Sequence, residues 1–246
     1  MEKLDQMTAL EKVYVEVAQK VIDYYAPVEA LSSADKANFE KTPERAARAW
    51  LEIARYVDSK AISSVCKERF NSLTCSITPK AKVVPALRKI LATSFPMEDS
   101  SHSSGLVIEG PILFESLCPH HLLPVKACAF VGYKPKDRVL GLSKIPRALK
   151  LLGSRPVLQE QLCRDMVDVL FLDKEQQAPH LVQIETEGSA VQIIATHGCM
   201  TQRGVHSDAS TLTTEIRGCF YQPEIKKEFY EAIESIMQTR SLIAKA

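Results

Sequence analysis

The sequence predicts an α+β fold, an antiparallel four-stranded sheet with helices on one face, preceded by an N-terminal helical region. After Gly105 the segments alternate as two β-rich stretches, two amphipathic helical stretches and two further β-rich stretches. Strands that follow one another as hairpins pair antiparallel, which favours helices segregated to one face of the sheet. A chain of 246 residues with 46% hydrophobic and 25% charged residues can bury one large core.

Helical spacing of apolar residues characterises the N-terminal part. Residues 8–25 predict one helix, and residues 32–57 predict a second, with Thr42 as its cap and Pro43 in its first turn. Residues 57–81 give no clear pattern, and "PALRKILATS" predicts a short helix. We therefore divide the chain into a helical region, a polar serine-rich loop and a β-rich domain, at 1–96, 97–105 and 106–246.

The β-rich domain is predicted from six segments. Its strands are expected in two hairpins, the second turning at Gly188 and Ser189: "LVIEGPILFESLC" with "VKACAFVGYKP", and "HLVQIETEG" with "AVQIIATHGCM". Its helices are expected between the hairpins and at the C-terminus: "SKIPRALKLLGSR", "PVLQEQLCRDMVDVLF" and "EIKKEFYEAIESIMQTRS".

Composition and charge exclude several function classes. The net charge is +1, so we expect no binding to nucleic acid or membrane, and an anionic ligand needs a local cluster of Lys and Arg. The charged N-terminus "MEKLDQMTALEK" lacks an apolar signal core, and no apolar run reaches membrane length, so we expect a cytoplasmic protein. The seven cysteines are irregularly spaced and odd in number, which favours free or metal-bound thiols.

Two clusters of Cys and His stand at predicted strand ends. Cys118, His120 and His121 end the first strand, and His197 and Cys199 end the last one. Strand ends of an antiparallel sheet can meet, and three mixed Cys and His ligands with a fourth position left to water describe a catalytic zinc site. A metal there lowers the pKa of water to about 7. The alternative interpretation is buried free cysteines and histidines with ordinary hydrogen bonds.

Basic residues beside the motifs suggest an anion site. Ser143, Lys144 and Arg147 lie at a predicted helix start, where free backbone N–H groups and cationic side chains converge. Arg45 lies in "TPER" and Arg203 follows Cys199 in "CMTQRG". The alternative is that these are solvated surface charges.

Gln159 and Glu160 lie together on the second predicted helix of the β-rich domain. A helical glutamate usually faces solvent. A buried carboxylate beside an amide, however, could read a guanine edge by accepting from its N–H groups.

Four ordered motifs carry a family resemblance. The stretches "CPHHLLP", "GLSKIPRALKLLGSRPVLQEQL" and "HGCMTQRG" resemble the motifs of GTP cyclohydrolase I, and "KTPERAARAW" resembles that family's N-terminal helix signature. The resemblance runs from about residue 8 to the C-terminus in the family's order. It favours the zinc site over the core alternative.

The resemblance implies a reaction, an assembly and a set of roles. The family converts GTP and water to 7,8-dihydroneopterin triphosphate and formate, the first step of pterin and folate biosynthesis. The implied fold is the tunnelling fold, with residues 106–246 as the catalytic domain. Sheets of five subunits join into a barrel, two rings stack into a homodecamer, and active sites lie between subunits. The implied roles are zinc ligands Cys118, His121 and Cys199; proton-transfer groups His120 and His197; guanine contacts Gln159 and Glu160; and triphosphate contacts Arg45, Ser143, Lys144, Arg147 and Arg203.

Three departures from the family pattern leave every ligand and proton carrier in place. Pro119 stands where the family usually has an acidic residue, Lys41 replaces the usual acid before "TP", and the segment 171–190 is longer than expected. Proline fixes φ and removes a donor, so the surroundings of the metal can differ.

Other function classes remain as alternatives. A non-catalytic paralogue would bind a purine nucleotide in a regulatory role, but the full Cys/His/Cys set and two extra histidines favour an enzyme. Nitrile reductase relatives need a nicotinamide, for which the chain has no glycine-rich motif. Pyruvoyl-tetrahydropterin synthases use three histidines for zinc. The sequence distinguishes neither a folate from a biopterin or deazaguanine pathway, nor the presence of a feedback protein.

Overall fold

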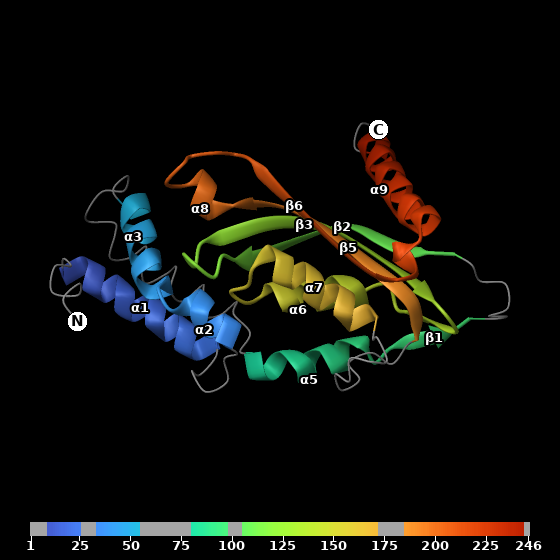
Figure 1. The fold of residues 1–246 in the computed structure, drawn as a ribbon, viewed down its shortest axis with the longest axis horizontal. Coiled ribbons are helices and arrows are strands. Elements are labelled where there is room, and N and C mark those ends of the chain that lie inside the picture. The colour runs from blue at the N-terminus through green and yellow to red at the C-terminus, as the bar shows by residue number, and fades with distance from the viewer. Residues whose placement is uncertain (1–8, 26–32, 55–79, 98–104, 172–184, 244–246) are drawn as a thin grey trace.

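The centre of the molecule is a four-stranded antiparallel sheet in the order β2-β3-β5-β6 (Figure 1). Its strands are β2 (Val107–Leu117), β3 (Pro124–Pro135), β5 (Thr186–His197) and β6 (Ser210–Gly218). A separate two-stranded sheet pairs β1 (Ser94–Pro96) with β4 (Arg138–Leu140). The computed structural model describes residues 9–25, 33–54, 80–97, 105–171 and 185–243.

Helices cover both faces of the sheet. Alternate residues of β3, among them Ala127, Ala129 and Val131, are buried in the main core beneath α6 and α7. The intervening Phe130 faces the other way and packs in a second cluster with Phe229 of α9. The expectation of helices on one face is therefore wrong, because β3 is apolar on both of its faces. The bounds are α6 (Lys144–Gly153), α7 (Gln159–Leu170) and α9 (Pro223–Ile243).

The predicted second hairpin is wrong, because β5 continues straight through Gly188 and Ser189. Ser189 pairs with Tyr133 on one side and Arg217 on the other. A Cβ atom on Gly188 would lie 2.6 Å from the carbonyl oxygen of Arg217, so this glycine permits a close approach of backbones. The strand that follows β5 in the chain and pairs with it is β6, "STLTTEIRG", whose polar composition hid its strand period.

The N-terminal helices lie at one end of the sheet, the end that carries α8 (Gly198–Thr201) (Figure 1). The helix predicted at 8–25 is confirmed, whereas the second predicted helix is two. The polar segment 97–105 and the patternless segment 57–81 fall almost wholly outside the described residues. The helices are α1 (Ala9–Tyr25), α2 (Ser33–Phe39), α3 (Thr42–Ala54) and α5 (Lys80–Leu91).

The expected cap of α3 has another partner. Thr42 is the first residue of α3, and its hydroxyl donates to the carbonyl oxygen of Pro119 at 2.9 Å. The division of the chain at residues 96 and 106 stays a prediction, and α5 packs against α6 of the sheet domain. Within the described ranges, every helix is too short or too polar to cross a membrane.

Glu109 on edge strand β2 gives a test of the fold through pH. Burial raises the pKa of its carboxyl from 4.5 to about 7. Between these values the folded state holds a proton that the unfolded chain releases, so stability falls as pH rises through this window. We expect Glu109→Gln to be more stable than the parent protein at pH 8 and equal to it near pH 4.5.

Urea unfolding of both proteins across this pH range measures the effect. Glu115→Gln on the same strand is the matched control, since Glu115 is exposed. A constant difference between Glu109→Gln and the parent at every pH contradicts the assignment.

Candidate metal centre and active site

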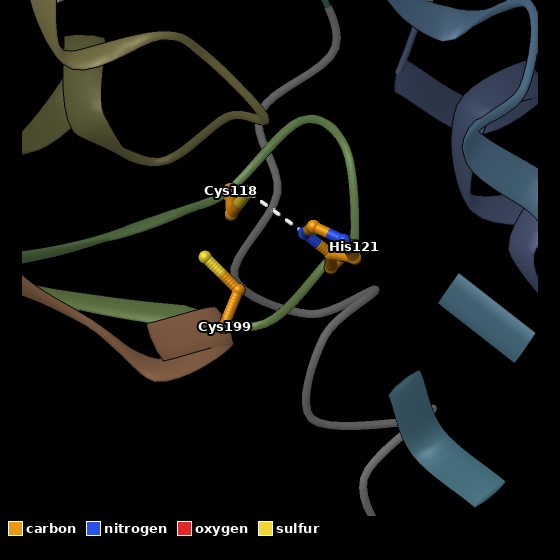
Figure 2. Close-up of side chains that lie close together, drawn as sticks. All are labelled: Cys118, His121 and Cys199. Atoms are coloured by element: carbon orange, nitrogen blue, oxygen red, sulfur yellow. Dashed lines mark hydrogen bonds between the residues drawn. The ribbon is translucent and has the colours of Figure 1, made fainter. Parts of the chain in front are cut away.

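The two Cys and His clusters meet at one end of the sheet. Residues 118–123 connect β2 to β3, and β5 ends at His197 directly opposite Val125 of β3. Cys199 follows in α8, and the ligand atoms of Cys118, His121 and Cys199 all lie within 4.8 Å of one another. Figure 2 shows the three side chains pointing toward a common space from the loop and from α8. The predicted meeting of strand ends is confirmed.

Backbone geometry holds this arrangement. The N–H group of Cys118 donates to the carbonyl oxygen of Leu123 at 2.9 Å, and that of Leu122 donates to the carbonyl of Cys118 at 2.8 Å. These two bonds close the loop into a tight turn. Gly198 lets α8 approach β3, because a Cβ atom there would lie 2.8 Å from the carbonyl oxygen of Pro124.

The spacing of the ligand atoms fits zinc. Sγ of Cys118 and Nδ1 of His121 are 3.6 Å apart. Tetrahedral zinc, with a Zn–S bond of about 2.3 Å and a Zn–N bond of about 2.0–2.1 Å, separates two such ligands by about 3.6 Å. Three protein ligands leave one position of a tetrahedron open, as in catalytic zinc sites.

The thiols of Cys118 and Cys199 shift each other's pKa in opposite directions. The pKa of the Cys118 thiol lies well below its usual value, first because Cys199 donates a hydrogen bond to it and further because His121 and backbone N–H groups do so. The same contact, together with burial, raises the pKa of Cys199 above its usual value. A cation that replaces the proton of this contact would leave two thiolates, which are ligands that suit a soft metal such as zinc.

Gln159 fixes the orientation of His197. Its amide nitrogen donates to the carbonyl oxygens of Ile193 and Thr211 and to the hydroxyl of Thr213, at 3.1, 3.0 and 3.2 Å. Its oxygen therefore faces Nε2 of His197, at 2.8 Å. Because this oxygen only accepts, Nε2 of His197 carries a proton, and a neutral ring leaves Nδ1 as its acceptor.

A cleft joins the metal-ligand cluster to the other predicted groups. His120 and His197 line it beside Cys118 and Cys199. Gln159 is buried in its wall, and Glu160 is exposed at its margin. Sequence reasoning did not identify four further lining residues, Val157, Leu158, Met200 and Thr211. The first two immediately precede Gln159, and Thr211 lies on the strand that its polar composition concealed.

The predicted triphosphate residues do not gather at this cleft. Ser143, Lys144 and Arg147 lie at the start of α6, whereas the last residue of α6, Gly153, packs against Phe114 of β2. Ser143 occupies the predicted N-cap position, but its exposed hydroxyl makes no capping hydrogen bond.

The remaining two arginines lie elsewhere. Arg203 follows α8, close enough to Cys199 to counteract the rise of that thiol's pKa. Arg45 is half-buried in the first turns of α3. The predicted anion-binding set is thus divided among three parts of the subunit.

Comparisons with known proteins match this part of the chain. A family model described as GTP cyclohydrolase I matches residues 80–234. A protein named GTP cyclohydrolase 1 from Clostridium perfringens (strain 13 / Type A) is 35% identical over 134 residues, which cover 54% of this chain and 67% of the relative. Proteins of the same name from Campylobacter jejuni and Campylobacter curvus are 37% and 38% identical over 142 residues, 57% of this chain and 70% of each relative. The family model begins at α5 and leaves out α1, α2 and α3.

Proposed function

This chain belongs to the GTP cyclohydrolase I family of enzymes, and we propose that it converts GTP and water to 7,8-dihydroneopterin triphosphate and formate. The observation that carries the proposal is the Cys118–His121–Cys199 cluster at a cleft that two further histidines line. Conversion of GTP requires a metal-assisted hydrolysis followed by several proton transfers, and this cleft offers groups for both.

Cys118, His121 and Cys199 would hold one zinc ion. When bound, zinc supplies Lewis acidity and lowers the pKa of its bound water to about 7, so that hydroxide is available at neutral pH. The 3.6 Å between Sγ of Cys118 and Nδ1 of His121, and the convergence of all three ligand atoms within 4.8 Å of one another, both support this ligand set.

The two other histidines are proposed as proton carriers. His120 would protonate N7 of guanine, which makes C8 electrophilic enough for water to add. His197 would serve the ribose after the imidazole ring opens, when a second acid and base are needed. Its Nε2 proton is committed to Gln159, so Nδ1 is the nitrogen proposed to exchange protons with the substrate.

Glu160 and Gln159 are proposed to read the guanine edge. The amide nitrogen of Gln159 already donates to three acceptors, and its oxygen, which accepts from Nε2 of His197, has a second lone pair that can accept from a ligand. A carboxylate and an amide oxygen both accept hydrogen bonds. They match the N1–H and exocyclic amine donors of guanine and leave the acceptor N1 of adenine unsatisfied.

The triphosphate contacts are proposed to come from more than one subunit. On β3, Tyr133 lies eight residues from Val125, roughly 25 Å along the strand at about 3.3 Å per residue. The hydroxyl of Tyr133 accepts a bond from Leu140, just before Lys144. This separation along the strand favours a substrate site that is shared between copies of the chain. A homodecamer, in which the start of α6 from one copy faces the cluster of another, would provide such a site.

The sheet edges, which are unpaired among the described residues, also support this assembly. Strands β2 and β6 are the outer strands of the sheet, and Leu113 and Leu212 on them are 66% and 57% exposed. Such edges favour pairing with another chain. In the proposed ring, sheets of five copies join edge to edge.

One set of measurements tests the function and assembly together. Zinc-loaded protein incubated with GTP should release formate and yield a pterin that fluoresces after oxidation, and light scattering should give a mass near ten chains. GTP binding without formate release would instead support a non-catalytic paralogue. An active monomer would contradict the shared site.

A further inference from the structure

The loop that supplies two of the proposed zinc ligands packs on the N-terminal helices. Leu117 and Leu122 flank Cys118 and His121, and both are buried in a cluster with α1 and α3. Leu122 is 1% exposed, among residues that include Val21, Tyr25 and Ala46. Figure 2 shows these helices, in blue, on the His121 side of the loop.

Leu122 has an unfavourable backbone conformation. Its φ of 52° lies in the left-handed region, which a side chain with a Cβ atom rarely adopts. A residue keeps such a conformation when its surroundings hold it there. The burial of the Leu122 side chain by α1 and α3 provides this restraint, so the helices help to maintain the turn between Cys118 and His121.

A buried hydrogen bond ties the same loop to α3. Thr42 is fully buried, and its hydroxyl lies 2.9 Å from the carbonyl oxygen of Pro119 and 3.2 Å from that of Asn38. A hydroxyl has one proton, and the shorter distance favours Pro119 as its acceptor. Pro119 lies next to Cys118 and two residues before His121, so this bond fixes the peptide between the two ligands.

We propose that Thr42 is a positioning residue for the metal centre, and that the N-terminal helices raise the affinity of this centre for zinc. The inference rests on the proposed function, since it needs Cys118 and His121 to be zinc ligands. A loop held in its binding conformation loses less conformational freedom when the metal binds, so its affinity is higher. Thr42 is neither a proposed metal ligand nor a lining residue of the cleft, and its hydrogen bond to the loop is made to the backbone of Pro119.

Zinc affinity of the full-length, assembled protein tests the proposal by competition with a chromophoric chelator. Thr42→Val keeps the shape of the side chain and removes the donor, and we expect about tenfold weaker zinc binding. Thr42→Ser restores the hydroxyl and should bind zinc nearly as the parent does. The matched control is Thr186→Val, because Thr186 is also buried and donates to a backbone carbonyl, that of Leu170, away from the cluster.

A second variant covers the case in which Thr42→Val does not fold. Leu122→Ala removes most of the buried side chain but keeps the Cβ atom and its preference against positive φ, so the loop loses its restraint and zinc affinity should again fall. Parental affinity in either folded variant overturns the proposal. So does an equal loss in Thr186→Val, which would indicate general destabilisation. If the parent protein binds no zinc, the proposed metal site itself is wrong. If the parent and the variants all bind zinc tightly, the metal site stands and only the role of Thr42 and the N-terminal helices is refuted.

Discussion

Cys118→Ser is expected to remove bound zinc and turnover together. The serine hydroxyl stays protonated at neutral pH and is a poor ligand for a soft metal, whereas the surroundings of Cys118 lower the pKa of its thiol. Metal sites contribute several kcal/mol to transition-state stabilisation, so the turnover should fall by about 10³-fold or more. Metal analysis of the purified protein and a formate assay on the same sample measure both effects.

Cys219→Ser is the matched control for this experiment. Cys219 is half-buried next to Gly218, which pairs with Gly188 at the other end of β5 from His197. The Cys219→Ser protein should keep about one zinc per chain and the turnover of the parent protein. A Cys118→Ser protein that retains full zinc and normal turnover would refute the ligand assignment.

His197→Ser is expected to separate the early and late steps of the reaction. His197 lines the cleft but is outside the proposed ligand set, so zinc should remain bound and water can still add at C8. The later proton transfers at the ribose would fail, and a ring-opened formamide or amine should accumulate. General acid and base groups typically contribute about 10²–10⁴-fold, so the loss of final product should be large.

His120→Ser is expected to stop the reaction earlier. Without a group to protonate N7, the first addition of water should fail and GTP should remain unchanged. Chromatography of quenched single-turnover mixtures distinguishes the two variants, with zinc content measured on each. If both variants stall at unreacted GTP with zinc bound, His197 acts at or before the first step and the division of roles is wrong.

Strand ends explain why much of the candidate site was predictable from the sequence. Cys118 and His197 each stand where a β-rich stretch stops, and antiparallel pairing of neighbouring strands brings such positions together. To bring the three proposed ligands together, the fold then needs only to place β3 and β5 side by side. The helices on the core face are equally predictable from the sequence, because their apolar residues recur with a clear helical period.

Long-range and polar contacts account for what was missed. Nothing local in the sequence indicates that Thr42 would donate to Pro119, 77 residues away. Glycine is common in turns, so Gly188 predicts a turn, whereas in the structure it allows close approach to the backbone of Arg217. In strand β6 the two apolar residues Leu212 and Ile216 are separated by three polar ones. Neither face of the strand is therefore strongly apolar, and its period of two is a weak signal.

The separation of Lys144 from Cys199 along the sheet has a kinetic consequence. If neither copy of the chain holds a complete substrate site, a dissociated subunit contributes no turnover at all. Specific activity would then depend on total protein concentration by the law of mass action, falling steeply once dilution passes the dissociation midpoint of the assembly. Cellular abundance of the chain would set the number of working sites as well as the number of subunits.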